Sequence, residues 1–217
     1  MGSNTRTMKR ILIFGNGTLS KKYSVLIKPA DYVIGVDRAA YWLIKQERIP
    51  DVAIGDFDSV TKEEFKTIQQ SVKNIQLFSK EKDQTDMELA VVHAIEKKPV
   101  EVLIFGGTGS RMDHTMVTLD LLDSFLCAQI PHFLINDNNR VRLVGRGKTV
   151  VEKASYRYIS ILPYTKSITL SLNGFRYDLS KTTLIRGTTR GVSNEIVSRK
   201  AEINLFSGKA WVVESKD

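Results

Sequence analysis

Short apolar runs alternate with amphipathic segments through the first two thirds of the chain. The runs have the length of buried strands, and the segments between them repeat apolar residues every three or four positions, as helices do. Strands are expected at 10–14, 32–36, 51–54, 75–78, 100–105 and 132–135, and helices at 39–46, 61–70, 88–97 and 116–129. Strands separated by helices predict an N-terminal domain of the α/β class with a mostly parallel sheet.

The pattern changes near residue 139, where the helical period disappears. Turn signals such as Asn173-Gly174 and Ser207-Gly208 then separate short β-rich runs. These runs lie at 141–144, 149–152, 156–162, 168–172, 182–185, 195–198, 201–206 and 210–214. The sequence therefore predicts an α/β domain over 8–139 and a smaller all-β, sandwich-like domain over 140–217. A domain of that size is expected to pack against a partner.

Composition narrows the class of protein. The 217 residues are 42% hydrophobic and 26% charged, which is typical of a globular protein with a core. Residues 1–7 are polar and look like an added leader before a natural start at Met8, and neither a secretory signal nor a membrane span is expected. The single cysteine, Cys127, is expected to be a buried thiol in a reducing, cytoplasmic setting. The net charge of +8 comes from scattered basic residues, so no nucleic-acid partner is expected.

Acidic residues gather after the expected strands of the first domain. Asp56 and Asp58 follow the strand at 51–54, and Asp83, Asp86 and Asp113 stand at the starts of two expected helices. Ligands of parallel sheets bind beyond the carboxyl ends of the strands, and carboxylates suit a hard cation such as Mg²⁺. Each Asp is also an ordinary turn or helix-start residue, and only their grouping favours one metal–polyphosphate site.

Phosphate-binding groups are expected on the same edge of the sheet. A glycine-rich loop follows a strand and precedes a helix, as phosphate-binding loops do, but it lacks the Gly-Lys-Ser/Thr ending of a Walker A motif. The candidate phosphate ligands are Lys82, Gly106, Gly107, Thr108, Arg111 and Asn136. A glycine turn without a ligand and a surface ion pair of Arg111 are the simpler alternatives.

Four stretches of the chain carry a resemblance to a known family. In order they are Gly55-Asp56-Phe57-Asp58-Ser59, Lys82-Asp83-Gln84-Thr85-Asp86, Gly109-Ser110-Arg111-Met112-Asp113-His114, and Gly174 to Leu179 with Gly191-Val192-Ser193-Asn194-Glu195. Together they resemble the signatures of thiamine pyrophosphokinases of the bacterial type. The segment Asp37-Arg38-Ala39-Ala40 departs from the family pattern, which usually has a glycine among these positions.

The resemblance implies an enzyme that transfers the pyrophosphoryl group of Mg-ATP to the hydroxyl of thiamine, giving thiamine diphosphate and AMP. It implies a homodimer with the active site at the interface. The catalytic residues would be Asp56, Asp58, Asp83, Asp86, Arg111 and Asp113, and the first four would hold the metal. Ser193 and Asn194 would contact thiamine, and Trp211 would stack on it or lie in the core.

Two other functions fit the same residues. Another Mg²⁺-dependent phospho- or nucleotidyltransferase would use the same carboxylates, and only the thiamine signature in the β domain argues against it. A non-catalytic nucleotide-binding module would fit the fold but would not need so many carboxylates. The role of Asp113, as a metal ligand or as the acceptor of the hydroxyl proton, stays open.

Overall fold

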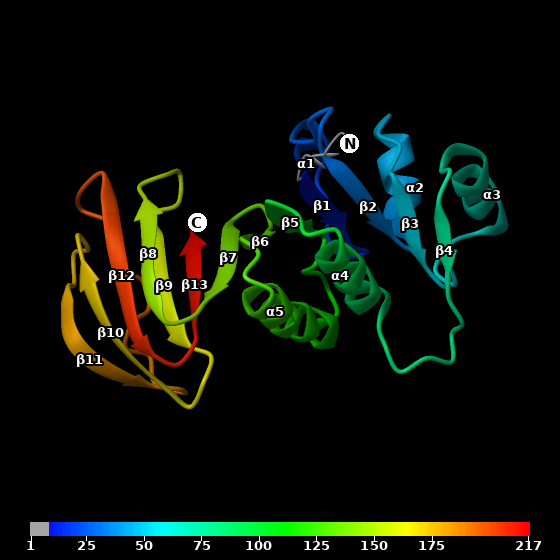
Figure 1. The fold of residues 1–217 in the computed structure, drawn as a ribbon. Coiled ribbons are helices and arrows are strands. Elements are labelled where there is room, and N and C mark those ends of the chain that lie inside the picture. Colours follow the sequence, from blue (N-terminus) through cyan, green and yellow to red (C-terminus); the bar gives the residue numbers. More distant parts are fainter. Residues whose placement is uncertain (1–8) are drawn as a thin grey trace, which may run out of the picture. The chain divides into compact units, whose positions relative to one another are not determined.

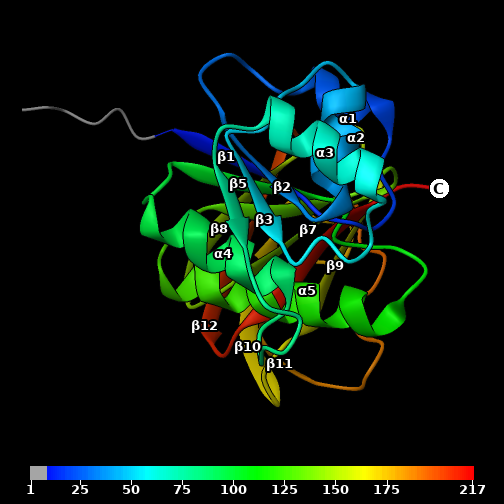
Figure 2. The same cartoon turned by 90° about the vertical axis from the view of Figure 1, so that its right-hand side faces the viewer.

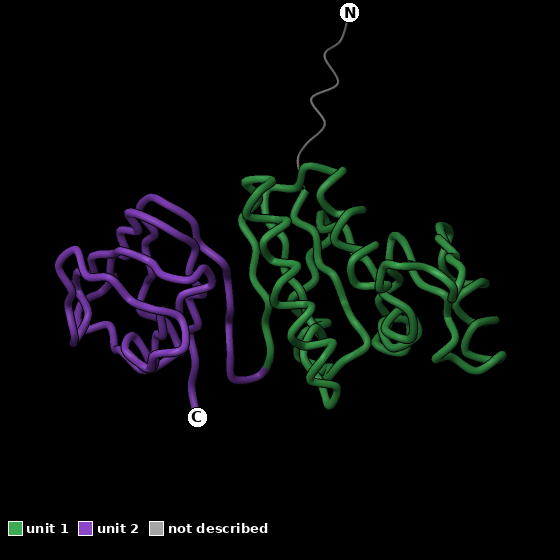
Figure 3. Tube along the Cα trace, turned by 90° about the horizontal axis from the view of Figure 1, so that it is seen from below, with its two compact units in different colours: residues 1–136 green, residues 137–217 purple. Residues whose placement is uncertain are grey.

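The structure, a computed structural model, describes residues 9–217. The leader and the start expected at Met8 lie outside the described residues. The chain forms two compact units that divide between Asn136 and Asp137 (Figure 3). Each unit has its own hydrophobic core. They are called unit 1 and unit 2 below.

Unit 1 is built on a parallel sheet, as the apolar runs predict. Its strands are β1 (Arg10–Phe14), β2 (Tyr32–Val36), β3 (Val52–Gly55), β4 (Ile75–Leu77), β5 (Glu101–Phe105) and β6 (His132–Ile135). They lie in the order β4-β3-β2-β1-β5-β6, and every neighbouring pair is parallel (Figure 1). The central strand β1 is almost wholly buried from Ile11 to Phe14 because helices cover both of its faces.

The helices of unit 1 form two layers. They are α1 (Lys21–Val25), α2 (Arg38–Lys45), α3 (Lys62–Ser71), α4 (Asp86–Glu96) and α5 (Met112–Cys127). The first three lie on one face of the sheet, and α4 and α5 lie on the other (Figure 2). Because the strands are parallel, all of them end at the same edge of the sheet. The loops that lead into α2, α4 and α5 meet at this edge.

Two helices of unit 1, α3 and α4, start directly after a threonine that caps them. Thr61 caps α3 in a reciprocal capping box with Glu64. Thr85 accepts a hydrogen bond from the backbone N–H of Glu88, so α4 begins at Asp86, two residues before the predicted start. The Glu88 carboxylate accepts a hydrogen bond from the Gln84 side chain. The early start places Asp86 in the first turn, where its charge complements the helix dipole.

Unit 2 consists of antiparallel strands, which confirms the predicted all-β class. Its strands are β7 (Asn139–Val144), β8 (Gly147–Glu152), β9 (Tyr158–Pro163), β10 (Ser167–Asn173), β11 (Leu179–Ile185), β12 (Lys200–Ser207) and β13 (Ala210–Ser215). One group pairs in the order β7-β13-β9 and the other in the order β11-β10-β12-β8. Alternate residues of both groups, such as Ile161 and Ile203, share one buried cluster. This is a sandwich arrangement.

Two expectations from the sequence are wrong. Residues 195–198 do not form a strand; this segment makes isolated bridges through Asn194 and Ile196 only. Cys127 is exposed rather than buried, because it is the last residue of α5 and lies past the face that packs on the sheet. None of the helices in residues 9–217 is long and apolar enough to cross a membrane.

Candidate active site

Two glycine-rich turns lie against each other where β1 and β5 end. The backbone N–H of Gly17 donates to the carbonyl of Gly106, and that of Thr18 donates to the carbonyl of Thr108, both at 2.8 Å. A Cβ on Gly17 would lie 2.3 Å from the Thr108 carbonyl oxygen, so only glycine permits this approach. Gly106 also has a positive φ of 63°. The two turns therefore form one rigid floor beyond the sheet edge.

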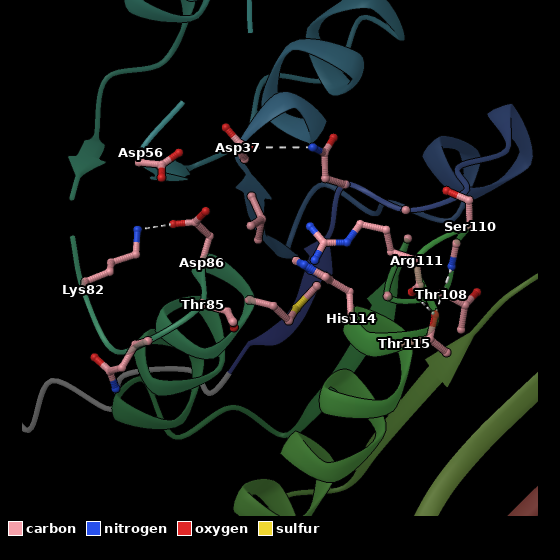
Figure 4. A pocket seen from close by; sticks show the side chains of 18 of the residues that line it. Asp37, Asp56, Lys82, Thr85, Asp86, Thr108, Ser110, Arg111, His114 and Thr115 are labelled. Carbon is pink, nitrogen blue, oxygen red and sulfur yellow. Dashed lines mark hydrogen bonds and ion pairs between the residues drawn. The ribbon is translucent and has the colours of Figure 1, made fainter. Parts of the chain in front are cut away.

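A cavity of about 380 Å³ opens above this floor, and its lining belongs to unit 1 (Figure 4). Residues of four loops and two helix starts line it: Asn16, Gly17, Val36, Asp37, Asp56, Lys80, Lys82, Gln84, Thr85, Asp86, Met87, Gly106, Gly107, Thr108, Gly109, Ser110, Arg111, His114 and Thr115. The cavity thus brings together most of the polar residues that the sequence places after the strands. Asp83 is exposed and is not part of the lining.

Three carboxylates converge at one side of the cavity. Asp37, Asp56 and Asp58 each offer an oxygen, and these oxygens lie within 4.8 Å of one another. Asp37 directly follows β2, while the other two follow β3, the neighbouring strand. Asp37 was not among the residues expected from the sequence. The signal was present, since it is an acidic residue directly after a buried strand on the same edge as Asp56.

The environment of Asp37 is suited to a cation. Burial raises the pKa of its carboxyl group, the Ser59 hydroxyl lowers it, and the charges of Asp86, Asp56 and Asp58 raise it further. Its Oδ1 atom is buried and has no hydrogen-bond partner within residues 9–217. Three carboxylates with an unsatisfied buried oxygen fit a hard divalent cation such as Mg²⁺, which takes oxygen ligands and neutralises the repulsion.

Two lysines lie against the acidic residues. Lys80 Nζ is 3.0 Å from Asp58 Oδ2, and the Lys80 ammonium lowers the pKa of Asp58. Lys82 Nζ lies 2.6 Å from Asp86 Oδ1 in a pair that is largely shielded from solvent (Figure 4). Lys82 was expected from the sequence, whereas Lys80 was missed. Both ammonium groups are placed to contact an anion that enters the cavity.

Arg111 lies at the other side of the cavity, at the start of α5. Its guanidinium donates two hydrogen bonds to Asp113, at 2.5 and 3.3 Å. This pair lowers the pKa of Asp113. Asp113 lies outside the main cavity and lines a smaller hollow of about 140 Å³ beside His114. The two hydrogen bonds therefore orient the Arg111 guanidinium toward Asp113.

Asn136 supports the glycine-rich loop from behind. Its amide donates to the Thr108 hydroxyl at 3.3 Å. Asn136 itself does not line the cavity. The hydrogen bond holds Thr108, which does line it, next to the Gly106–Gly107 backbone.

In unit 2, the two residues expected to contact thiamine have different surroundings. Ser193 is exposed, and its backbone N–H donates to the Ser160 hydroxyl. Asn194 is 4% exposed, and its amide makes three hydrogen bonds with the backbone of Tyr177 and Glu195. Asn194 therefore holds two loops together, and Ser193 is the accessible member of the pair. Trp211 is half-buried and meets the Tyr164 ring edge-on at 5.0 Å.

Comparison with known proteins decides what class of protein carries this cavity. A family profile described as thiamin pyrophosphokinase, catalytic domain, matches residues 23–134, and one described as thiamin pyrophosphokinase, vitamin B1 binding domain, matches residues 148–209. The chain belongs to the thiamine pyrophosphokinase family. It is 35% identical to the thiamine pyrophosphokinase of Bacillus subtilis over 85% of this chain and 87% of that protein.

Solved structures of the family agree with this assignment. The crystal structure of the Bacillus subtilis thiamine pyrophosphokinase superposes with a TM-score of 0.90 at 32% identity and covers 96% of this chain and 100% of that chain. That of the Geobacillus thermodenitrificans protein gives 0.87 at 29% identity, with 96% and 98% covered. The yeast thiamin pyrophosphokinase, at 16% identity and a TM-score of 0.79, shares the fold. The predicted family, fold class and enzymatic nature are confirmed. Enzymes of this family transfer the pyrophosphoryl group of ATP to thiamine.

Proposed function

We propose that the cavity of unit 1 binds Mg-ATP and that Asp37, Asp56, Asp58 and Asp86 hold its metal, directly or through water. The observation that carries the proposal is the meeting of three carboxylates at the ends of two adjacent strands, one of them with a buried oxygen that lacks a hydrogen-bond donor among residues 9–217. Asp37 joins three of the four metal residues expected from the sequence. The fourth, Asp83, stays a prediction and is left out of the group proposed here, because it neither lines the cavity nor belongs to the cluster of three carboxylates.

The residues around the cavity account for pyrophosphoryl transfer. A bound Mg²⁺ neutralises charge on the phosphate oxygens and makes the phosphorus atoms easier to attack. Lys80, Lys82 and Arg111 bind the phosphate oxygens, exchanging their carboxylate partners for the nucleotide. The Gly106–Thr108 backbone lies under the phosphates. The thiamine hydroxyl attacks the β-phosphorus, the bond to the α-phosphate oxygen breaks, and AMP leaves.

We propose further that thiamine is bound by the loop of unit 2 that carries Ser193, with Asn194 holding the loop in shape. The buried amide bonds of Asn194 support the second role. The two units then correspond to the predicted domains 8–139 and 140–217, whose boundary lies a few residues after Asn136. A cytoplasmic homodimer with its active site at the interface completes the proposal.

A single-turnover experiment tests the chemistry. The protein is mixed with ATP, Mg²⁺ and an excess of thiamine, and the products are separated by chromatography. Attack on the β-phosphorus gives AMP and thiamine diphosphate in equal amounts. ADP with thiamine monophosphate would show attack on the γ-phosphorus, and binding of ATP without turnover would indicate a nucleotide-binding module. Either result would contradict the proposal.

A further inference from the structure

We propose that Ser59, together with Asn16, is a positioning residue that turns one oxygen of Asp37 toward the metal. The inference rests on the proposed metal role of Asp37. A chain of hydrogen bonds lies beside the acidic cluster. The Ser59 hydroxyl donates to Asp37 Oδ2 at 2.6 Å, and the Asn16 amide donates to the Ser59 hydroxyl oxygen at 3.2 Å.

The direction of these bonds is fixed by chemistry. A hydroxyl group has one proton, and here it is used on Asp37, so the hydroxyl oxygen receives the Asn16 amide proton as an acceptor. The same Asn16 amide nitrogen also lies 3.5 Å from Asp37 Oδ2 (Figure 4). The donors in residues 9–217 that reach this carboxylate therefore all meet Oδ2. Oδ1 is buried and receives none within the same residues.

The backbone of Asp37 shows that this arrangement is not ordinary helix capping. Asp37 stands at the N-cap of α2, where an aspartate usually accepts a hydrogen bond from the first turn. Its side chain makes no capping hydrogen bond, and its φ is 51°, a conformation that L-residues adopt rarely. Such a conformation is unfavourable and persists where the surroundings hold it. The side chain points to Ser59 instead.

The three residues also connect three loops. Asn16 follows β1, Asp37 follows β2 and Ser59 follows β3, and these strands are neighbours in the sheet. Ser59 stands one residue after Asp58, so a single turn supplies both metal carboxylates and the donor that orients the third. Outer residues that orient metal ligands in this way typically contribute tenfold to a hundredfold in metal affinity.

Metal binding without turnover tests the inference. Mn²⁺ replaces Mg²⁺, and its binding is followed by electron paramagnetic resonance, with and without a non-hydrolysable ATP analogue. We expect Ser59→Ala to weaken Mn²⁺ binding by about tenfold to a hundredfold. Ser59→Thr keeps the hydroxyl and restores most of the affinity, and Asn16→Ala gives a smaller loss than Ser59→Ala. In steady-state assays, the metal concentration for half-maximal rate rises for Ser59→Ala, and kcat at saturating metal falls much less.

Two controls separate positioning from folding. Ser24 in unit 1 also donates its hydroxyl proton, to the carbonyl of Lys21, and does not line the cavity, so Ser24→Ala should leave Mn²⁺ affinity unchanged. In an Asp37→Asn background, Ser59→Ala should cause no further loss, because the carboxylate that it orients has been removed. If Ser59→Ala is too unstable to study, the Mn²⁺ affinities of Asn16→Ala and Ser59→Thr are compared instead.

The outcomes are distinguishable. Wild-type affinity in Ser59→Ala, or an equal loss with and without the Asp37 carboxylate, overturns the positioning role and leaves the metal site in place. A wild-type protein that binds no Mn²⁺, even with the ATP analogue, overturns the metal site and the positioning role together.

Discussion

Asp58 and Asp86 each form an ion pair with a lysine. These ion pairs determine how readily the two carboxylates can bind a metal ion when no nucleotide is present. Lys80 holds Asp58, and Lys82 holds Asp86. A metal ion and a lysine compete for the same carboxylate, whereas a polyphosphate attracts both the metal ion and the lysine. If the site binds metal and nucleotide as proposed, we therefore expect the lysines to weaken metal binding in the empty protein and to strengthen nucleotide binding.

Lys80→Met separates these two effects. Without nucleotide, we expect the variant to bind Mn²⁺ a few times more tightly, because a positive charge has been removed from beside Asp58. With Mg²⁺ present, it should bind ATP more weakly, because a phosphate contact is lost. Isothermal titration calorimetry measures both affinities. Lys73→Met, at an exposed position that does not line the cavity, is the control. Weaker Mn²⁺ binding in Lys80→Met would contradict this view of the lysine.

The metal carboxylates themselves are tested by removing their charge. Asp58→Asn and Asp86→Asn should each lose most of their activity at limiting Mg²⁺, because Asp58 belongs to the carboxylate cluster and Asp86 lines the cavity. Both variants should unfold at nearly the wild-type temperature, since both side chains lie outside the core. Asp120→Asn, at an exposed position of α5, is the control. Asp83→Asn, made in parallel, decides whether this exposed residue takes part. Wild-type turnover in either Asp58→Asn or Asp86→Asn would rule out a shared metal site.

The sequence predicted the site residues that belong to recognisable motifs. Asp56, Asp58, Lys82, Asp86 and Arg111 all belong to signatures, and all of them border the cavity or its carboxylate cluster. Asp37 was missed although it directly follows a buried strand, a signal that the sequence does contain. Asn16 and Lys80 were missed for a physical reason: their importance comes from contacts between separate loops, Asn16 with Ser59 and Lys80 with Asp58, and the local sequence gives no sign of these contacts.

Among the helices and strands, one ion pair connects the starts of two neighbouring strands. Arg10 is the first residue of β1, and Asp31 directly precedes β2. The Arg10 guanidinium donates two hydrogen bonds to Asp31, at 3.0 and 2.6 Å, and the backbone N–H of Lys28 donates a third. Burial raises the pKa of Asp31, but the hydrogen bonds from Arg10 and Lys28 outweigh it, so the pKa is lowered overall.

A lowered pKa predicts how stability depends on pH. The charged Asp31 stabilises the fold above its unfolded pKa of about 3.9, and this contribution is lost as the pH falls through the lower folded pKa. Asp31→Asn should therefore reduce the free energy of unfolding at pH 7 by about 1–3 kcal/mol, and the difference should shrink below about pH 4. Urea denaturation at several pH values measures it, with Asp120→Asn as the control. A constant difference from pH 3 to pH 7 would show that the charge of Asp31 is not the cause.

Helices and strands could be predicted wherever burial imposes a clear pattern of apolar residues along the chain. The strands of unit 1 are continuous apolar runs because both faces of the sheet are covered, and all of them were found. Helix α1 was missed because its five residues, Lys21–Val25, are too few to show a period. The segment at 195–198 contains two β-branched residues, Ile196 and Val197, which favour a strand, yet the buried amide of Asn194 and the bridge at Ile196 hold it as a loop.

In the molecule as a whole, the groups proposed to bind the two substrates belong to different units. The cavity with its carboxylates belongs to unit 1, and Ser193 lies on a loop of unit 2. One active site needs both units, and in the proposed homodimer they come from different protomers. In a mixed dimer of two different inactive variants, one site would then collect both lesions and the other would collect none.

Mixed dimers therefore decide whether the site crosses protomers. Asp86→Asn removes the nucleotide half, and the double variant Ser193→Ala/Asn194→Ala removes the thiamine half, namely the exposed side chain and the amide that holds its loop in shape. Each variant alone should be inactive. Co-expressed with two affinity tags and purified on both, the mixed dimer should regain roughly half of the wild-type activity, because one of its two sites is intact. A site formed within one protomer would give no recovery, since every protomer carries a lesion. An inactive mixed dimer would thus place both substrates on one chain and leave the assignment of the chemistry to unit 1 unaffected.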